Sequence, residues 1–405
     1  MTRVQRALVA TLAILIPAGT ALAEGETSSF AESLKKGKAK VSLRYRFESV
    51  SDDAAAKDAE ASTLRTTLSY RTSPYKNWSL FAEAENVAAV GDDNYRNAGA
   101  GSLSNGMTDR AVVADPALTE LNQAYLRWDD GKTKWTLGRQ EILYGDQRYV
   151  GAVGWRQNHQ SFDALNFMST AVEKWTFTYS FVDAIHRIFG DSQDIAAHLL
   201  NAKADLGKVG ALTVYGYVLD YDDVAGLSSS TFGAELAGKR KLEGDWSLLY
   251  EVELAQQSDA GDNPNDLDVG YRHLSLGGSR ANLTLRLGLE ILEGSGQGAF
   301  RTPLATLHKW NGWADKFLAT PRDGLEDLYF HLGGKCAKGL AWAAIYHDFS
   351  ATEGSASYGE ELDLLLSYKT SWGQTFALKG ALYDAETHSA DTDKWMLWTA
   401  YAFGG

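Results

Sequence analysis

The sequence has one cysteine, Cys336, so no disulfide can form within the chain. It has only 6 prolines, and beyond the first 23 residues no stretch approaches the ~20 consecutive apolar residues that a membrane-spanning helix needs. Basic residues are too few to balance the acidic ones, and the formal net charge of −13 argues against nucleic acid as a partner. These absences exclude a disulfide-stabilised scaffold and a bundle of spanning helices.

The N-terminus has the layout of a secretory signal peptide. Arg3 and Arg6 precede the apolar run Ala7–Ile16, and Ala21–Ala23 offers an A-x-A cleavage site before Glu24. A membrane anchor helix is the alternative, but the apolar run is too short to span a bilayer. We predict a signal peptide over residues 1–23 and a mature chain over 24–405, with 37 basic and 52 acidic residues and a net charge of −15.

The abundant feature of the mature chain is alternation with the period of a strand. In Ala281–Leu292, leucine and isoleucine alternate with Thr284, Arg286, Gly288 and Glu290. In a soluble sandwich the polar face of such a strand is exposed to water. In a membrane barrel the apolar face contacts lipid and the polar face lines a wet lumen.

The same pattern predicts eighteen strands along the chain. They lie near residues 40–48, 64–71, 78–85, 119–129, 134–142, 160–169, 174–183, 195–206, 210–221, 230–240, 246–254, 267–277, 281–292, 326–334, 338–349, 362–369, 374–384 and 393–403.

The connections between these strands alternate in length. Short connections such as 72–77 and 129–133 alternate along the chain with longer ones such as 49–62, 87–118 and the largest, 293–325. A soluble β-sandwich has no reason to sort its loops in this way, whereas outer-membrane barrels have short periplasmic turns and long extracellular loops. The 39 Gly, 12 Trp, 19 Tyr and 15 Phe also suit a barrel with tight turns and aromatic girdles. We therefore predict one all-β domain, a transmembrane antiparallel β-barrel of about 18 strands.

If the apolar side chains face lipid, the other parity lines the lumen, and its charges nearly cancel. They form either a selectivity lining for an anionic solute or a network of salt bridges that stiffens the barrel. The predicted inward residues are twelve cations, Lys40, Arg44, Arg46, Arg65, Arg71, Arg127, Lys203, Lys239, Arg272, Arg286, Lys369 and Lys379, and eleven anions, Glu48, Glu83, Glu85, Asp205, Glu235, Glu251, Glu253, Asp268, Glu290, Glu361 and Asp363.

One strand does not follow the parity rule. Arg139 and Glu141 share the parity of Trp135 and Leu137. Either a bulge intervenes or Trp135 faces inward. With either alternative, we assign Arg139 to the lumen.

No catalytic or metal motif is present. The eight histidines show no HExxH motif and no paired metal-ligand spacing, so we predict no enzyme activity and no cofactor. Paired loop aspartates such as Asp52 with Asp53 and Asp92 with Asp93 either hold Ca²⁺ or keep exposed loops soluble.

Three segments resemble the alginate export family of bacterial outer-membrane proteins. They are R-Y-V-G-A-V-G-W-R-Q-N-H-Q-S-F-D-A from Arg148 to Ala164, T-P-L-A-T-L-H-K-W-N-G-W-A-D-K-F-L from Thr302 to Leu318, and Y-R-T-S-P-Y-K-N-W-S-L-F-A-E-A-E-N-V from Tyr70 to Val87. The resemblance covers nearly all of the mature chain and implies an eighteen-stranded barrel. It also implies a monomeric channel whose arginine-rich lumen conducts an anionic polyuronate and is plugged by long loops. The inward acids of this chain are a departure from such a conduit.

By this resemblance, particular loop residues belong to the pore. Arg148 and Arg156 would sit where a loop meets the pore, and Thr302–Leu318 would fold over the mouth as a lid. Trp310 and Trp313 either stack on sugar rings at the entrance or pack locally within a long loop.

The sequence thus predicts a channel in the outer membrane. Its expected partners are outer-membrane lipid, a hydrophilic and anionic solute or polysaccharide, and periplasmic export proteins of the kind the family uses. The alternatives from other classes are an outer-membrane enzyme of the lipase type and a non-conducting surface adhesin.

Overall fold

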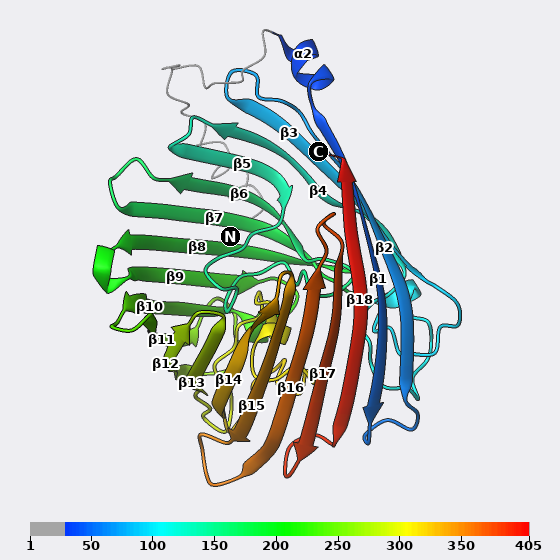
Figure 1. Cartoon of the computed structure of the whole chain (residues 1–405), viewed down its shortest axis with the longest axis vertical. Coiled ribbons are helices and arrows are strands. Elements are labelled where there is room, and N and C mark those ends of the chain that lie inside the picture. Colours follow the sequence, from blue (N-terminus) through cyan, green and yellow to red (C-terminus); the bar gives the residue numbers. More distant parts are fainter. Residues whose placement is uncertain (1–28, 405) are drawn as a thin grey trace.

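The computed structural model describes residues 29–404, and the predicted signal peptide lies outside this range. The described residues form an eighteen-stranded antiparallel sheet in which each strand pairs with its neighbours in the sequence. The first strand also pairs with the last, from Lys40 opposite Gly404 to Asp52 opposite Thr392. The sheet is therefore closed into a barrel (Figure 1).

All the strands except β5 reach the ~9 residues that a tilted strand needs to cross a bilayer, and β5 has 8. Their bounds are β1 Lys38–Asp52, β2 Ala59–Arg71, β3 Trp78–Ala89, β4 Leu118–Asp129, β5 Thr133–Gln140, β6 Ser161–Ser169, β7 Trp175–His186, β8 Ser192–Asp205, β9 Ala211–Tyr221, β10 Ser229–Lys241, β11 Trp246–Asp259, β12 Asp268–Arg280, β13 Leu283–Leu292, β14 Leu325–Ala337, β15 Leu340–Ser350, β16 Ser357–Lys369, β17 Thr375–Ala385 and β18 Thr392–Gly404.

Helical structure is short and lies at the strand ends. The helix α2, Phe30–Lys35, precedes β1 and packs on the turn after β2, where the backbone N–H of Ser73 donates to the carbonyl of Ser33 at 3.1 Å. Among the described residues no helix is both long and apolar enough to cross a membrane. The single turns of 3₁₀-helix are η1 Gly101–Leu103, η2 Gly207–Val209, η3 Ala225–Leu227 and η4 Leu307–Lys309.

The two faces of the barrel wall differ as the alternation predicts. On the outer face, Leu287 and Leu276 are 54% and 60% exposed, because none of residues 29–404 covers them. On the inner face, Glu290 is 2% exposed because loops fill the lumen. An apolar outside and a polar, filled inside characterise a barrel in a bilayer.

All eighteen predicted strands are present, with shifts at their ends. The predicted connection 49–62 shrinks to 53–58, because β1 and β2 continue as a hairpin beyond the apolar stretch. The connection 187–191 on the same rim is equally short. The extra length of this rim is concentrated in three loops, 90–117, 141–160 and 293–324.

Candidate functional site

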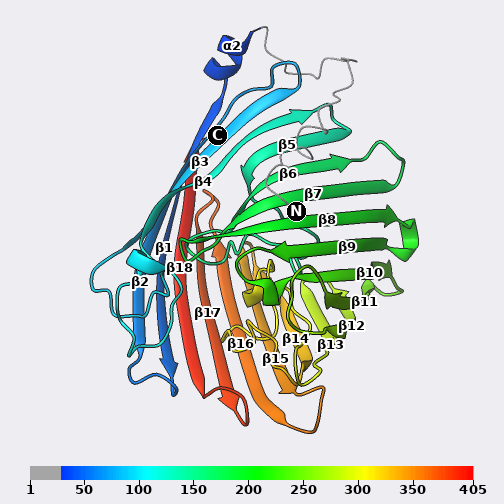
Figure 2. The same ribbon diagram turned by 180° about the vertical axis from the view of Figure 1, so that it is seen from behind.

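Two long loops fold into the barrel. We call 141–160 the first plug loop and 293–324 the second plug loop, and both are seen inside the ring of strands in Figures 1 and 2. They pair with each other, because the N–H of Gly151 donates to the carbonyl of Leu304 at 2.9 Å and Nε2 of Gln160 donates to the same oxygen at 3.2 Å. The plug is thus one structure built from two segments far apart in the sequence.

Arg148 anchors the plug to the barrel wall. It is 2% exposed, and its Nε lies 2.6 Å from Oε1 of Glu290 on β13. Its other guanidinium nitrogens donate to Thr302 Oγ1 and Asn311 Oδ1, each at 3.3 Å, and the cation lies 5.2 Å from the ring of Trp310. Burial alone would lower the pKa of Arg148, but Glu290 holds it above its ordinary value. The guanidinium therefore joins both plug loops to β13 as a permanent cation.

Arg156 is a second anchor, at another strand of the wall. Its Nη1 lies 3.2 Å from Oε2 of Glu48 on β1 and 3.8 Å from Asp115 of the loop 90–117. Its Nη2 lies 3.3 Å from Asp315 of the second plug loop. One buried cation thus holds together three loops and a strand.

A chain of polar contacts links the second plug loop to β17 and β18. Nδ1 of His308 lies 2.6 Å from Oδ1 of Asp315, and its Nε2 lies 2.6 Å from Nζ of Lys379. Nζ of Lys394 lies 2.6 Å from the other oxygen of Asp315. Burial lowers the pKa of His308 well below its ordinary value, although Asp315 raises it. Burial would raise the pKa of Asp315, but His308 and Lys394 bring it well below its ordinary range.

The same loop also contacts β16. Oε1 of Glu361 accepts hydrogen bonds from the backbone N–H groups of Trp313 and Ala314, at 2.5 and 2.7 Å. Gly312 has a φ of 84° and lies against Glu361, where a Cβ would collide with the carboxylate. The indole of Trp313 then lies 3.5 Å from the ammonium of Lys379.

An inner cavity of about 350 Å³ remains between the plug and the basic side of the wall. The first plug loop is fixed at its edge by Arg44, whose guanidinium donates to Gln157 Oε1 at 2.8 Å and to the carbonyl of Gly154 at 3.0 Å. The cavity is lined by Arg44, Arg46, Gly154, Trp155, Trp313, Leu365, Lys379 and Trp398. This lining contains three cations, three tryptophans and no carboxylate.

An outer cavity of about 480 Å³ lies on the other side of the plug, toward the rim that carries the long loops. Its charged lining residues are Asp52, Arg156, Arg187, Asp315, Lys316 and Lys394. Trp155 lines both cavities, so its indole separates them.

Trp155 is held in place by stacking. Its ring lies 3.2 Å from the imidazole of His308, centroid to centroid, with 8° between the planes. The guanidinium carbons of Arg46 and Arg156 lie 4.1 and 4.3 Å from the indole centroid. The barrier between the two cavities is therefore an aromatic ring surrounded by cations.

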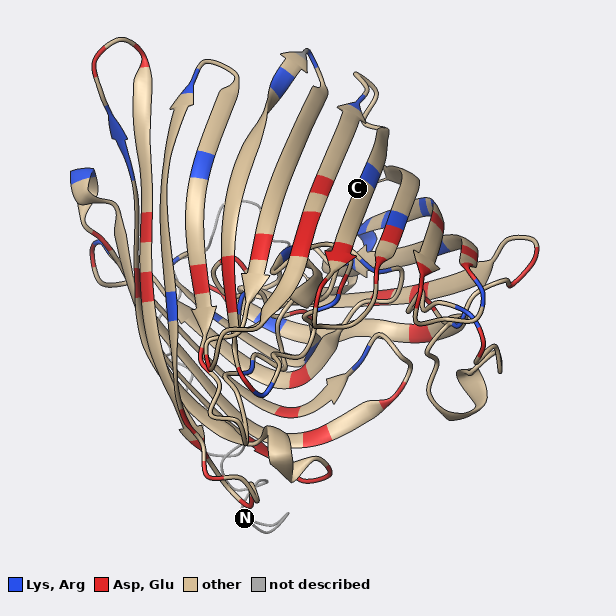
Figure 3. Cartoon of the chain, turned by 90° about the horizontal axis from the view of Figure 1, so that it is seen from below, with Lys and Arg blue, Asp and Glu red and all other residues tan. Residues whose placement is uncertain are grey.

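The lumen wall is divided by charge. Arg44, Arg46, Arg65, Lys379 and Lys394 lie on the neighbouring strands β17, β18, β1 and β2, which we call the basic wall. We call β10 to β14 the acidic wall, since Glu235, Glu251, Glu253, Glu290 and Asp327 project from it. Figure 3 shows both signs of charge along the strands. The inward positive and negative charges nearly cancel in number, but because they lie on different walls they produce an electric field across the pore.

The structure places most of the sequence-predicted lumen residues on the inward parity. They do not form one site, because several lie near the turns and others are covered by the plug. The inward residues are Lys40, Arg44, Arg46, Arg65, Arg71, Arg127, Lys203, Lys239, Arg286, Lys369, Lys379, Glu48, Glu83, Glu85, Asp205, Glu235, Glu251, Glu253, Glu290, Glu361 and Asp363.

The assignment of Arg272 and Asp268 to the lumen is wrong. In β12 the buried side chains Val269, Tyr271, His273 and Ser275 share one parity, so Arg272 and Asp268 lie on the other, outer parity. Arg272 forms an ion pair there with a glutamate at the extracellular end of β13. Charge alone suggested an inward position, but the rim of a barrel is also wet enough for an ion pair.

The assignment of Arg139 to the lumen is also wrong. Arg139 lies on the outer parity with Leu137, which is 52% exposed, and its Nε lies 2.9 Å from Oδ1 of Asp163 on β6. Trp135 faces outward too and packs on Phe167, with 4.5 Å between ring centroids. The Arg139–Asp163 pair lies near the extracellular end of β5 and β6, where a charged side chain reaches the membrane surface.

The loop residues implied by the family resemblance lie close together, but not at the mouth. Arg148 and Arg156 lie where a loop meets the wall and are buried there. Trp310 packs on Arg148, whereas Trp313 lines the inner cavity. The expected lid, Thr302–Leu318, is part of the second plug loop and extends into the lumen, so its placement over the mouth was wrong.

Sequence reasoning missed several residues that hold the plug. His308 is paired with Lys379, 71 positions away, and Lys394 with Asp315, 79 positions away. No local motif marks such pairs. The only signal of these pairs in the sequence was indirect. Inward charges of both signs in nearly equal number indicate that an ion-pair network can form.

Comparison with known proteins places the chain among outer-membrane barrels. Residues 38–297, well over half of the chain, match the profile of the family described as "Alginate export". The sequence matches no curated protein. Pseudomonas aeruginosa OpdK, solved with vanillate, is 17% identical, with a TM-score of 0.71 over 92% of this chain and 100% of that one.

Two further solved structures have the same fold. Pseudomonas aeruginosa OccK9 (OpdG) is 16% identical, with a TM-score of 0.73 over 92% of this chain and 100% of that one. Acinetobacter baumannii OccAB2 is 13% identical, with a TM-score of 0.72 over 92% of this chain and 99% of that one.

Proposed function

Because the chain belongs to the alginate export family, we propose that it is an outer-membrane channel for an anionic, hydrophilic solute of about the size of one ring. The observation that carries this proposal is the lining of the inner cavity, which combines Arg44, Arg46 and Lys379 with three tryptophans and no carboxylate. Guanidinium and ammonium groups attract a carboxylate, and the indoles offer faces on which a sugar or aromatic ring can stack.

The size of the cavity favours a small solute over a polymer. A volume of about 350 Å³ is at the low end of the ~300–1,000 Å³ typical of small-molecule sites. A polyuronate chain would require Trp155 and its neighbours to move aside along the whole pore. A monomeric uronate or an aromatic carboxylate fits the cavity as it stands, and vanillate, the compound named with OpdK, is an aromatic carboxylate.

The field across the pore supports the same proposal. An anion is drawn toward the basic wall and repelled by the acidic wall, so its path is confined to the side where the inner cavity lies. The inward charges can thus both hold the plug through salt bridges and select an anionic solute. Arg156 only holds the plug, whereas Arg44 and Arg46 do both. Arg44 donates to Gln157 and Arg46 donates to the carbonyl of Trp155 and pairs with Glu48, and both line the cavity.

The test is ion selectivity in planar bilayers. The wild-type channel in a KCl gradient is expected to show an anion-selective reversal potential, and Arg44→Gln with Arg46→Gln is expected to reduce it. The matched control is Lys203→Gln with Lys239→Gln, which removes two inward cations from strands outside the basic wall. Cation selectivity in the wild type, or equal loss in both double variants, would contradict the proposal.

A second measurement addresses the solute. Galacturonate and vanillate are expected to block the wild-type current at lower concentrations than galactose and vanillyl alcohol, their neutral counterparts. Equal block by charged and neutral compounds would contradict anion recognition. A wild-type barrel that conducts nothing would instead favour the adhesin alternative.

A further inference from the structure

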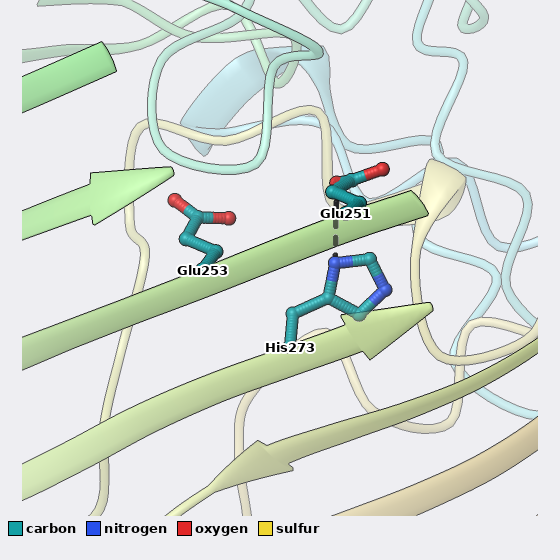
Figure 4. A group of neighbouring side chains, drawn as sticks. All are labelled: Glu251, Glu253 and His273. Carbon is teal, nitrogen blue, oxygen red and sulfur yellow. Dashed lines mark ion pairs between the residues drawn. The ribbon is translucent and has the colours of Figure 1, made fainter. Parts of the chain in front are cut away.

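We propose that Glu251, Glu253 and His273 bind a divalent metal ion of the zinc type on the acidic wall. Glu251 and Glu253 project inward from β11, and His273 projects inward from the adjacent strand β12, directly opposite Glu253 in the register. One ligand atom from each residue lies within 4.8 Å of the others. Figure 4 shows the two carboxylates and the imidazole on the same side of the two strands.

The Nδ1 of the imidazole faces the carboxylate cluster. His273 is 2% exposed, and its buried Nδ1 makes no hydrogen bond in the described part of the chain. This Nδ1 lies 3.2 Å from Oε1 of Glu251, at ion-pair distance but without hydrogen-bond alignment. Its Nε2 lies 2.9 Å from the hydroxyl of Tyr329. When Nε2–H donates to that hydroxyl, Nδ1 presents a lone pair to the two carboxylates.

Each carboxylate is oriented by a partner outside the cluster. Nη1 of Arg286 donates to Oε2 of Glu251 at 3.0 Å, which leaves Oε1 on the side of His273. The hydroxyl of Tyr215 donates to Oε1 of Glu253 at 2.7 Å. Outer partners that fix the ligands are typical of metal sites, whereas a simple ion pair does not need all three.

The ligand set determines the class of metal. Two carboxylates and a neutral imidazole carry a charge of about −2, which a divalent cation neutralises. An imidazole with carboxylates suits zinc better than magnesium or calcium, which prefer oxygen ligands alone. Bonds of ~2.0–2.1 Å at a tetrahedral angle place two ligands a little over 3 Å apart, close to the 3.2 Å between Nδ1 and Oε1. Glu251 retains 15% side-chain exposure, so the ion can enter from the lumen and keep a water as its fourth ligand.

A metal there would also stabilise the plug. Burial raises the pKa of Asp146 in the first plug loop, Lys309 lowers it, and the charge of Glu251 raises it further. A cation between Glu251 and Glu253 would offset this repulsion between the plug and the acidic wall. The three ligands are not among the residues that line the inner cavity.

The first test is metal content. Purified, folded protein is treated with EDTA, dialysed, and titrated with ZnCl₂, and bound zinc is measured by mass spectrometry. We expect one zinc ion per wild-type chain and its loss in His273→Gln and Glu253→Gln. The matched control is His331→Gln, which removes an inward histidine of β14, two strands from β12 and outside the cluster, and should leave the stoichiometry unchanged.

A second variant tests the positioning role of Tyr329. Tyr329→Phe keeps the ring but removes the hydroxyl that orients His273. We expect zinc affinity to fall by about 10–100-fold, as for other outer partners of metal ligands. Unchanged affinity would contradict the proposed orientation of the imidazole.

A third measurement needs no variant. X-ray absorption of the zinc-loaded wild type is expected to show imidazole nitrogen and carboxylate oxygen at about 2.0–2.2 Å. A shell of oxygen alone, zinc retention in both His273→Gln and Glu253→Gln, or no zinc binding by the wild type would overturn the proposal. These outcomes leave the anion-channel proposal untouched, because ion selectivity is measured separately.

Discussion

Arg148 of the first plug loop and Glu290 of β13 form a buried ion pair, with 2.6 Å between Nε and Oε1 and each side chain 2% exposed. The pair connects a loop to the barrel wall. Neither partner can be removed without leaving a charge in a place that water does not reach.

Replacing Arg148 by Met should therefore release the plug. Leaving Glu290 unpaired is expected to cost about 3–5 kcal/mol. We expect lower thermal stability, faster hydrogen exchange in 141–160 and 293–324, and larger conductance fluctuations. Arg322→Met is the control, since Arg322 is an exposed cation of the same second plug loop. Equal stability of the two variants would show that the ion pair does not hold the plug.

Trp155 separates the inner and outer cavities, so its removal should join them. We predict a higher single-channel conductance and weaker anion selectivity for Trp155→Ala, because the narrowest part of the path loses an aromatic wall. The comparison is Trp372→Ala, which removes a 64% exposed tryptophan from the turn between β16 and β17. If both variants conduct like the wild type, the path does not pass Trp155.

Acid should weaken the attachment of the second plug loop to β17. Neutral His308 donates from Nδ1 to Asp315 and accepts at Nε2 from Lys379; a second proton at Nε2 would face the ammonium. Because the folded-state pKa of His308 lies below its unfolded value, its contribution is complete above about pH 6.5 and is lost as the pH falls toward the folded pKa. Asp315, whose pKa is also lowered, contributes with the same sign at lower pH.

The measurement is thermal stability at pH 7.5 and 5.5. We expect His308 to account for a loss of up to about 1.4 kcal/mol per pH unit below about 6.5. His308→Gln should reduce this dependence, because glutamine does not titrate. Asp146 acts in the opposite direction, since its raised pKa makes its contribution decrease as the pH rises, so only the difference between wild type and variant isolates His308. An identical dependence in both proteins would contradict the assignment.

Adjacent residues of β16 test which face contacts lipid. Leu366 is 46% exposed on the outer face, and Ser367 faces the lumen at nearly the same depth. Leu366→Arg is expected to cost about 2–4 kcal/mol in bilayer unfolding measurements, whereas Ser367→Arg should cost much less because it projects into the wet lumen. A larger cost for Ser367→Arg than for Leu366→Arg would show that the face assigned to the lumen contacts lipid.

The fold was predictable because it depends on a local pattern in the sequence. Alternation in Ala281–Leu292 is a property of neighbouring residues, and repeated eighteen times it leaves a closed barrel as the arrangement that pairs every strand. Parity failed only where charge was allowed to outweigh position, at Arg139, Arg272 and Asp268. Leu137 shares the parity of Arg139, and Leu274 and Leu276 share the parity of Arg272 and Asp268. These leucines already indicated which face was outward.

The interior of the pore was much less predictable. Arg148 was suggested by family resemblance, but its partner Glu290 follows it by over a hundred residues, and only the folded loop brings them together. The division of the lumen into a basic and an acidic wall has the same cause. It depends on how the strands lie around the ring, where β1 adjoins β18, and not on the order of charges along the chain.

The pairing of β1 with β18 also constrains how the molecule is made. Each strand can pair with the next as soon as that one emerges, but the second edge of β1 must wait for the last residues of the chain, since Val41 lies opposite Phe403. A nascent or truncated chain would therefore expose two unsatisfied strand edges. The barrel can close only after synthesis is complete, because the last pairing to form joins the first strand of the polypeptide to the last.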